Sequence, residues 1–416
     1  MSIVHQFRRG RRGEAGQTLV LYVIMTLALV LVVAMCVDGG TIYLTKAELD
    51  KAADAAVLTA IRNLYQGQTQ ASTLAQAAFT ANYRGGGPAT NAPAASITFA
   101  TDSNNNTTVS ILATATFNTY FMRIIPRFQT FQVSSAATAT RAKLIMSVVL
   151  DHSGSMQNNG GSTALPPAVN TFISYFDDTM DQVSLVSFAS TTNLNVSVRR
   201  PFKSAITSAV NAMTFGGATY ADGGLQLALQ QNNSVPVAPG DNTIKVVVLF
   251  TDGYANTFQY TWPTNATYNL GGFDPPASAY AVLNPTNGVQ LTDKKGYNSW
   301  PQGGESIPGF FNSSWTTFLS VDGSTKSVTP ANCTAEGGLR ALATATAIRN
   351  TNMYIYCIGL GNALDQSFLQ QLANDPAAST YNPNQPAGEA AFAPSSSQLQ
   401  AVFQQIAAKI LMRLTK

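Results

Sequence analysis

The chain has 416 residues, of which 11% are charged, with a net charge of +3, two histidines and three cysteines. This length accommodates two or three domains. After the N-terminal arginines no basic patch with interleaved aromatic residues appears, which argues against nucleic acid as a partner. The few histidines and cysteines leave little material for a zinc site. The polar residues are instead Thr, Ser, Asn, Gln and Gly, a composition that is typical of proteins outside the cytoplasm.

An uncharged apolar segment runs from Thr18 to Val37, directly after a cluster of arginines that ends at Arg12. As a helix, its roughly 20 residues span the hydrocarbon core of a bilayer, and the preceding arginines place the N-terminus in the cytoplasm. We therefore expect a basic cytoplasmic tail over 1–17 and a transmembrane helix over 18–38. The rest of the chain is then expected on the periplasmic or extracellular side.

Three other interpretations of the apolar segment remain open. A cleaved signal peptide has a shorter apolar core, of roughly 7–15 residues. Lipoprotein-type cleavage before Cys36 is disfavoured because Met35 stands where a small residue is expected. A buried helix of a soluble core leaves the arginines unexplained.

In the next part of the chain the spacing of the apolar residues changes from a helical pattern to a strand pattern. Apolar residues recur on one helix face from Ile42 to Leu64, and a second helix is expected over 70–82, which predicts a helical stalk over 39–94. Alternating residues then predict antiparallel strands at 96–101, 108–117 and 128–141. We expect a small β-rich region over 95–142 with a structural role, either as a spacer or as a platform packed on the stalk.

Motifs around the apolar segment resemble those of a known family. Ala-Gly-Gln-Thr-Leu-Val-Leu at 15–21, Val-Asp-Gly-Gly at 37–40 and Leu-Asp-Lys-Ala-Ala-Asp-Ala-Ala at 49–56 occur in order. They resemble the N-terminal segment of TadG-like Flp pilus-assembly proteins. The resemblance implies a single-pass protein of the bacterial inner membrane with pilus or other envelope components as partners. The alternative is a generic anchor with an Ala-rich stalk.

The region 143–416 is expected to be an α/β fold with a doubly wound, mostly parallel sheet. The apolar runs at 143–150 and 245–250 are typical of strands buried on both faces. Further strands are expected at 183–189, 194–199 and 354–360. Helices are expected at 168–177, behind two prolines, and at 396–414.

Oxygen-bearing side chains follow both buried runs and an intervening Gly-Gly turn. The carboxyl ends of parallel strands meet at one edge of the sheet, where ligands bind in such folds. Hard cations such as Mg²⁺, or alternatively Mn²⁺ or Ca²⁺, prefer oxygen ligands. The alternative is that these residues only cap a helix and form an ordinary turn. The predicted metal ligands are Asp151, Ser153, Ser155, Thr219 and Asp252.

This combination resembles the von Willebrand factor A domain, which is Rossmann-like, and its metal-ion-dependent adhesion site. The resemblance implies that Ser153, Ser155 and Thr219 are hydroxyl ligands, while the two aspartates bind the ion directly or through water. It also implies an acidic group on a protein ligand. His152 is expected to be a solvent-facing bystander, so that a metal-assisted hydrolase is a weaker interpretation than a non-enzymatic adhesion component. A third interpretation is a structural envelope protein whose metal only stabilises the fold.

Two further features of this region are a long insertion and a pair of cysteines. A segment of roughly 80 residues, with an insertion at about 254–332, separates Asp252 from the next helix, where short connections are usual. Its aromatic residues are expected either to shape the ligand surface or to form a core of their own. They are Trp262, Trp300, Trp315, Tyr260, Tyr268, Tyr297, Phe310 and Phe311. Cys333 and Cys357 are expected to form a disulfide, because the helix after the insertion runs antiparallel to the strand at 353–358.

Overall fold

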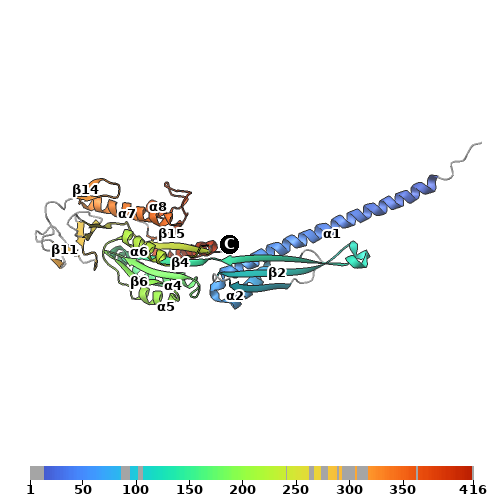
Figure 1. The fold of residues 1–416 in the computed structure, drawn as a ribbon, viewed down its shortest axis with the longest axis horizontal. Coiled ribbons are helices and arrows are strands. Elements are labelled where there is room, and N and C mark those ends of the chain that lie inside the picture. Colours follow the sequence, from blue (N-terminus) through green and yellow to red (C-terminus); the bar gives the residue numbers. More distant parts are fainter. Residues whose placement is uncertain are drawn as a thin grey trace, which may run out of the picture. The chain divides into compact units, whose positions relative to one another are not determined.

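The computed structural model describes residues 14–85, 94–101, 106–239, 241–261, 267–272, 280–287, 290–292, 305–306, 317–361 and 364–414. The chain divides into two compact units, one formed by residues 1–102 and 107–140 and the other by 103–106 and 141–416. Figure 1 shows the elements of both. Each unit is described by itself.

The first unit combines helices with a three-stranded sheet. α1 (Glu14–Arg62) is one continuous helix through the apolar segment and beyond it, followed by the short helix η1 (Leu64–Gln66) and by α2 (Gln68–Asn82). β1 (Ala94–Thr101), β2 (Thr107–Asn118) and β3 (Thr130–Arg141) lie in the order β1-β2-β3, with β1 and β2 antiparallel. Two single turns, η2 (Met122–Ile124) and η3 (Pro126–Phe128), connect β2 to β3.

The two expected parts of this unit share one core. Small and apolar side chains on the C-terminal half of α1, such as Leu49, Ala53 and Ala56, pack with Val109 and Ile111 of β2. Alternate residues of β2 are buried, as the period-2 pattern predicts. The β-rich region is therefore a platform packed on the helix, one of the two roles that the sequence left open.

The second unit is built on a six-stranded sheet with the order β16-β15-β7-β4-β5-β6. All neighbouring strands are parallel except β6, which is antiparallel to β5. The expected fold class is thus confirmed. The strands are β4 (Lys143–Asp151), β5 (Gln182–Phe188), β6 (Thr192–Arg199), β7 (Thr243–Thr251), β15 (Tyr354–Leu360) and β16 (Glu389–Ala393).

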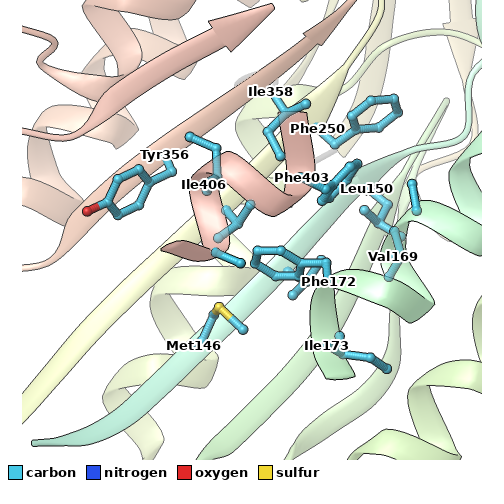
Figure 2. Close-up of a cluster of buried hydrophobic side chains, with 14 of the residues drawn as sticks. Met146, Leu150, Val169, Phe172, Ile173, Phe250, Tyr356, Ile358, Phe403 and Ile406 are labelled. Atoms are coloured by element: carbon cyan, nitrogen blue, oxygen red, sulfur yellow. The ribbon is translucent and has the colours of Figure 1, made fainter. Parts of the chain in front are cut away.

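Helices cover both faces of this sheet because its central strands are apolar on both. Met146, Val148 and Leu150 of β4 face a core made with α4, α5 and α9, which contains Phe172 and Phe403 (Figure 2). Val149 faces the opposite core, made with α6, α7 and α8. The helices of the unit are α3 (Gly154–Asn158), α4 (Gly161–Ser174), α5 (Lys203–Asn211), α6 (Ala221–Ser234), α7 (Pro330–Asn350), α8 (Gln366–Ala373), η4 (Ser396–Gln398) and α9 (Leu399–Arg413).

One helix starts earlier than the sequence predicts. α4 begins at Gly161, and Pro166 and Pro167 lie inside it rather than before it. Gly160 has a φ of 72° and turns the chain between α3 and α4. This early start places Leu165, which is fully buried, in the core a turn sooner than a helix beginning at Ala168 allows.

The insertion forms short strands of its own. β8 (Thr257–Thr261), β9 (Thr267–Gly272), β10 (Tyr280–Leu283), β11 (Gln290–Thr292) and β12 (Glu305–Ser306) make one sheet, and β13 (Thr317–Leu319) pairs with β14 (Thr325–Ser327). Phe258 packs on Phe318 at 4.9 Å between ring centroids, and the Arg340 guanidinium lies 4.8 Å from the Phe258 ring. These aromatic side chains form a small core. The three tryptophans, Tyr297, Phe310 and Phe311 lie outside the described residues.

The expected disulfide is not formed, since Cys333 and Cys357 are free, buried thiols. Cys357 lies in the middle of β15, close enough to Arg349 in the last turn of α7 for the charge of that guanidinium to act on the thiol. Cys333 lies in the first turn of the same helix. The 16-residue separation along a helix corresponds to about 24 Å. The prediction failed because it placed Cys357 at the strand end that faces the start of the helix.

Candidate metal centre

Three loops meet at the carboxyl edge of the six-stranded sheet. Asp151 is the last residue of β4, Ser153 and Ser155 lie at the start of α3, and the loop after β7 carries Asp252. The two strands are neighbours, with Leu150 paired to Phe250, so their ends lie side by side. The third loop joins α5 to α6 and carries Thr219. The local sequence explains this arrangement, because both apolar runs are followed by polar residues at the same edge of the sheet.

Direct hydrogen bonds connect four of the five predicted ligands. The Ser153 and Ser155 hydroxyl oxygens are 3.1 Å apart, and Ser155 Oγ donates to Asp252 Oδ1 at 2.7 Å. The Ser153 backbone N–H donates to Asp151 Oδ1 at 2.8 Å. These residues therefore form one contiguous cluster rather than independent caps and turns.

The fifth predicted ligand, Thr219, is hydrogen-bonded to Asn256 in the loop after β7. Its N–H donates to Asn256 Oδ1 at 2.8 Å, and the Asn256 N–H donates to its carbonyl at 3.1 Å. In the same loop, the Gly217 carbonyl accepts a 3.0 Å hydrogen bond from Gly154 N–H. The segments after β4 and β7 thus both form hydrogen bonds with the loop that carries Thr219.

The two carboxylates are buried close to each other. Asp151 is fully buried and Asp252 is 5% exposed. Burial, followed by the charge of Asp252, raises the pKa of Asp151 to about 7. Burial also raises the pKa of Asp252, although hydrogen bonds from Ser155 and Asn159 act against this shift. Neither carboxylate forms an ion pair with a Lys or Arg in the described part of the chain.

A divalent cation fits this donor set. Two buried carboxylates without a basic partner are costly, and a metal ion among them offsets that cost. Within the described ranges no group of three or more His, Cys, Asp and Glu side chains is placed to hold a metal. The centre therefore depends on hydroxyl oxygens together with Asp151 and Asp252, a set that suits a hard cation.

The sequence predicted that His152 faces solvent. In the structure its side chain instead supports the loop that carries Thr219. Its ring Nδ1 donates to the Thr214 carbonyl at 2.8 Å, and its own carbonyl accepts from Gly216 N–H at 2.8 Å. Burial lowers the pKa of the imidazole, and its buried Nε2 has no hydrogen-bond partner among the residues that the structure describes. The side chain is turned toward the Thr214 loop because its backbone continues the edge of β4, with the His152 N–H bonded to the Phe188 carbonyl.

Three supporting residues were not identified from the sequence. Thr251 Oγ1 donates to Asp151 Oδ2 at 2.6 Å, Asn159 donates to Asp252 Oδ2 at 2.8 Å, and Asn256 holds Thr219. Thr251 carries a recognisable signal, since the strand that ends in Asp252 places it beside Asp151. The two asparagines carry none, because their contacts arise from loops whose paths the sequence does not determine.

The fold and the cluster together define a doubly wound α/β domain with an oxygen-rich centre at the carboxyl edge of its sheet. Residues 146–271 match the family model described as the von Willebrand factor type A domain, and the chain therefore contains such a domain. The matched range includes all five predicted ligands. No curated protein matches the chain.

Several solved structures are similar to part of the chain. The pilus adhesin SpaC from Lactobacillus rhamnosus GG has 15% identity and a TM-score of 0.41, over 78% of this chain and 34% of that chain. The vWF domain of the type V pili tip protein from Porphyromonas gingivalis has 15% identity and a TM-score of 0.40, over 66% and 97%. Proximal thread matrix protein 1 from the mussel byssus, with a zinc-occupied MIDAS motif, has 15% identity and a TM-score of 0.36, over 65% and 46%. Less than half of the first and third of these chains is covered.

Proposed function

We propose that the protein is a membrane-anchored, metal-dependent adhesion or protein-binding component of Flp-type pilus assembly, without enzymatic activity. The observation that carries the metal-dependent part is the hydrogen-bonded cluster of Asp151, Ser153, Ser155 and Asp252, beside which Asn256 of the loop after β7 holds the Thr219 backbone. The assignment to pilus assembly is supported by the TadG-like motifs of the N-terminal segment.

The proposed ion is Mg²⁺, with Mn²⁺ or Ca²⁺ as alternatives. Two carboxylates balance the charge of a divalent ion, while hydroxyl ligands add none. When bound, the ion supplies a coordination position for a carboxylate oxygen of the partner protein. The exposed position of the loops at the edge of the sheet supports this use, because Ser155 and Asn159 retain accessible surface.

Anchoring is proposed through α1, with the N-terminus in the cytoplasm and the bulk of the chain on the periplasmic or extracellular side of a bacterial inner membrane. Within the described residues, one helix is long and apolar enough to cross a membrane, although a signal sequence passes the same test. From Leu19 to Val33 its large apolar side chains are more than half exposed. That exposure supports a lipid-facing segment, since burial in a protein core would cover it.

The proposal of a non-enzymatic role is supported by the surroundings of the cluster. A hydrolase needs a general base beside a metal-bound water. His152 is the nearest imidazole in the sequence, and its Nδ1 is engaged by Thr214. A catalytic activity of the purified protein that His152→Ala abolishes, with metal binding retained, would reinstate the enzymatic alternative.

The binding role is tested in cells of the source organism. The variant Asp252→Asn keeps the shape of the side chain but removes one charge of the centre. Asp54→Asn, an exposed position on α1, is the matched control. We expect surface adherence and surface-exposed pilin to fall for Asp252→Asn and to stay at the wild-type level for Asp54→Asn, at equal amounts of folded protein. Unchanged adherence despite lost metal binding would instead favour a structural envelope protein whose metal only stabilises the fold.

A further inference from the structure

The connection between β2 and β3 is fastened to α1 at the point where the apolar segment of that helix ends. Asp38 is the first charged residue after the segment and is fully buried. Its Oδ1 accepts a 2.8 Å hydrogen bond from Tyr120 N–H. Its Oδ2 accepts hydrogen bonds of 3.1 Å from Phe121 N–H and 2.7 Å from Met122 N–H. Three consecutive backbone donors thus bind one carboxylate, which fixes the height of the connection along α1.

The base of the connection is closed by a second set of hydrogen bonds. Thr119 N–H donates to the Gln129 carbonyl at 3.0 Å, and its hydroxyl donates to the Phe128 carbonyl at 2.7 Å. Between these residues the chain forms the single turns η2 and η3. We call residues 119–129 the tip loop. It is a defined structure with fixed ends rather than an open connection.

The tip loop exposes apolar and basic side chains where a water-soluble turn would carry polar ones. Ile124 is 85% exposed, Phe121 47% and Ile125 46%. Arg123 and Arg127 stand among them and are exposed as well. Large apolar side chains next to arginines are typical of segments that lie in a membrane interface, where the arginines meet lipid phosphates.

The tip loop also lies at the height that such a role requires. The uncharged stretch before Asp38 has roughly the 20 residues that span a bilayer core as a helix. Ala34, one turn before Asp38 on the same face of α1, is 8% exposed, while the neighbouring Val33 and Met35 are more than half exposed. η2 contacts α1. The covered face of α1 therefore coincides with the position of the tip loop at the outer end of the apolar segment.

We propose that the tip loop is a second membrane contact, which inserts Phe121, Ile124 and Ile125 into the outer interface of the same bilayer that α1 spans. Asp38 holds it at that depth, and Arg123 and Arg127 bind lipid phosphates. This inference rests on the proposed anchoring through α1. Its consequence is that the first unit has two attachments to the bilayer, so that it cannot rotate freely about a single helix.

The test uses a spin label on the full-length protein in vesicles of phosphatidylethanolamine and phosphatidylglycerol. The label is placed at Ile124→Cys in a Cys36→Ser background, in which the other two cysteines are buried. Leu112→Cys, on an exposed position of β2, is the matched control. The wild-type Cys36 itself, labelled separately, reports whether α1 is in the bilayer. Each label is probed with oxygen, which concentrates in lipid, and with a nickel complex, which stays in water.

We expect the label at Ile124 to show the lipid pattern, with oxygen accessibility shifted toward the value at Cys36, and the label at Leu112 to show the aqueous pattern. Asp38→Asn, which removes one acceptor oxygen, should shift the Ile124 label toward water, whereas Asp54→Asn should not. A lipid pattern at Cys36 with an aqueous pattern at Ile124 would overturn this inference and leave the anchor intact. Aqueous patterns at both positions would overturn the proposed anchor and this inference together.

Discussion

Thr251 Oγ1 donates a 2.6 Å hydrogen bond to Asp151 Oδ2 between the ends of the two central strands, β7 and β4. The other oxygen of the carboxylate accepts from the Ser153 backbone N–H at 2.8 Å. Both oxygens of Asp151 are thereby oriented by the protein itself. These two hydrogen bonds hold the Asp151 carboxylate in one orientation at the carboxyl edge of the sheet.

The first prediction concerns this hydrogen bond. Thr251→Val keeps the shape of the side chain but removes the hydroxyl donor. In the wild type that hydrogen bond stabilises the charged form of Asp151. A hydrogen bond to a charged group contributes about 1.5–3 kcal/mol, so we expect Mg²⁺ affinity to fall by roughly tenfold or more. Calorimetric titration measures it. Thr251→Ser retains the hydroxyl and should stay near wild type, and equal affinities for the two variants would contradict the prediction.

The second prediction is a pH dependence of metal binding. The pKa of Asp151 is raised from 3.8 to about 7, first by burial and then by the charge of Asp252. Below that pH a proton competes with the ion, so Mg²⁺ affinity should rise with pH and level off above about 7. Asp252→Asn removes the second cause and should lower the pH at which Asp151 loses its proton. An affinity that is constant from about pH 5 to pH 8 would be incompatible with this mechanism.

The same shift acts in the opposite direction on the metal-free protein. The folded state binds the Asp151 proton more tightly than the unfolded chain does. This group therefore stabilises the fold at low pH, and the contribution is lost as pH rises from about 4 to 7. Thermal unfolding in a chelator should show this loss, and added Mg²⁺ should reverse it.

The third prediction separates the position of Thr219 from its chemistry. Asn256→Ala removes the side-chain oxygen that accepts the hydrogen bond from Thr219 N–H and thereby orients the loop. We expect weaker Mg²⁺ binding, by roughly fivefold to tenfold for the loss of about one hydrogen bond, with little change in melting temperature. Asn158→Ala, at an exposed position of α3, is the control. A reduction of the same size in both variants would show that Asn256 has no special role.

The fourth prediction concerns a buried ion pair that holds the start of the second unit. Arg141 Nη1 and Nη2 donate to the two Asp181 oxygens at 2.9 and 2.7 Å, and both side chains are almost fully buried. Arg141→Met leaves Asp181 uncompensated and should lower the free energy of unfolding by about 3–5 kcal/mol. The double variant Arg141→Met/Asp181→Leu should recover a large part of that loss. Denaturant titration measures both, and a double variant less stable than the single one would contradict this account.

The fifth prediction concerns the cysteines. Burial raises the pKa of the Cys333 thiol to about 12, and that of the Cys357 thiol is also raised. Thiolates are the reactive form, so both side chains should react with a thiol reagent only after unfolding. In denaturant without reductant, three thiols per chain should react. A reaction with only one thiol would restore the disulfide that the sequence suggested.

The sequence predicted the central strands and the meeting of Asp151, Ser153, Ser155 and Asp252 at one edge of the sheet, because both depend on local patterns. Apolar runs that end in Asp151 and Asp252 determine where strands stop, and strand ends of a parallel sheet share an edge. The start of α4 was missed because the left-handed turn at Gly160 outweighs the ordinary preference for proline in a first helical turn. The Asn256 contact and the tie between Asp38 and residues 120–122 were out of reach. They join segments 37 or more residues apart through loops, whose paths follow from packing rather than from local propensity.

The central claim is that one divalent ion binds at the cluster of oxygen ligands. Its most direct test is a titration of the chelator-treated protein, with Mg²⁺ monitored by calorimetry and Mn²⁺ by electron paramagnetic resonance. For the wild type and Asp54→Asn we expect one ion per chain. For Ser155→Ala we expect weakened binding, and for Asp252→Asn a loss of binding, with folding unchanged by circular dichroism. Binding of one ion that neither variant weakens would place the metal elsewhere and contradict the assignment of Asp151, Ser153, Ser155, Thr219 and Asp252.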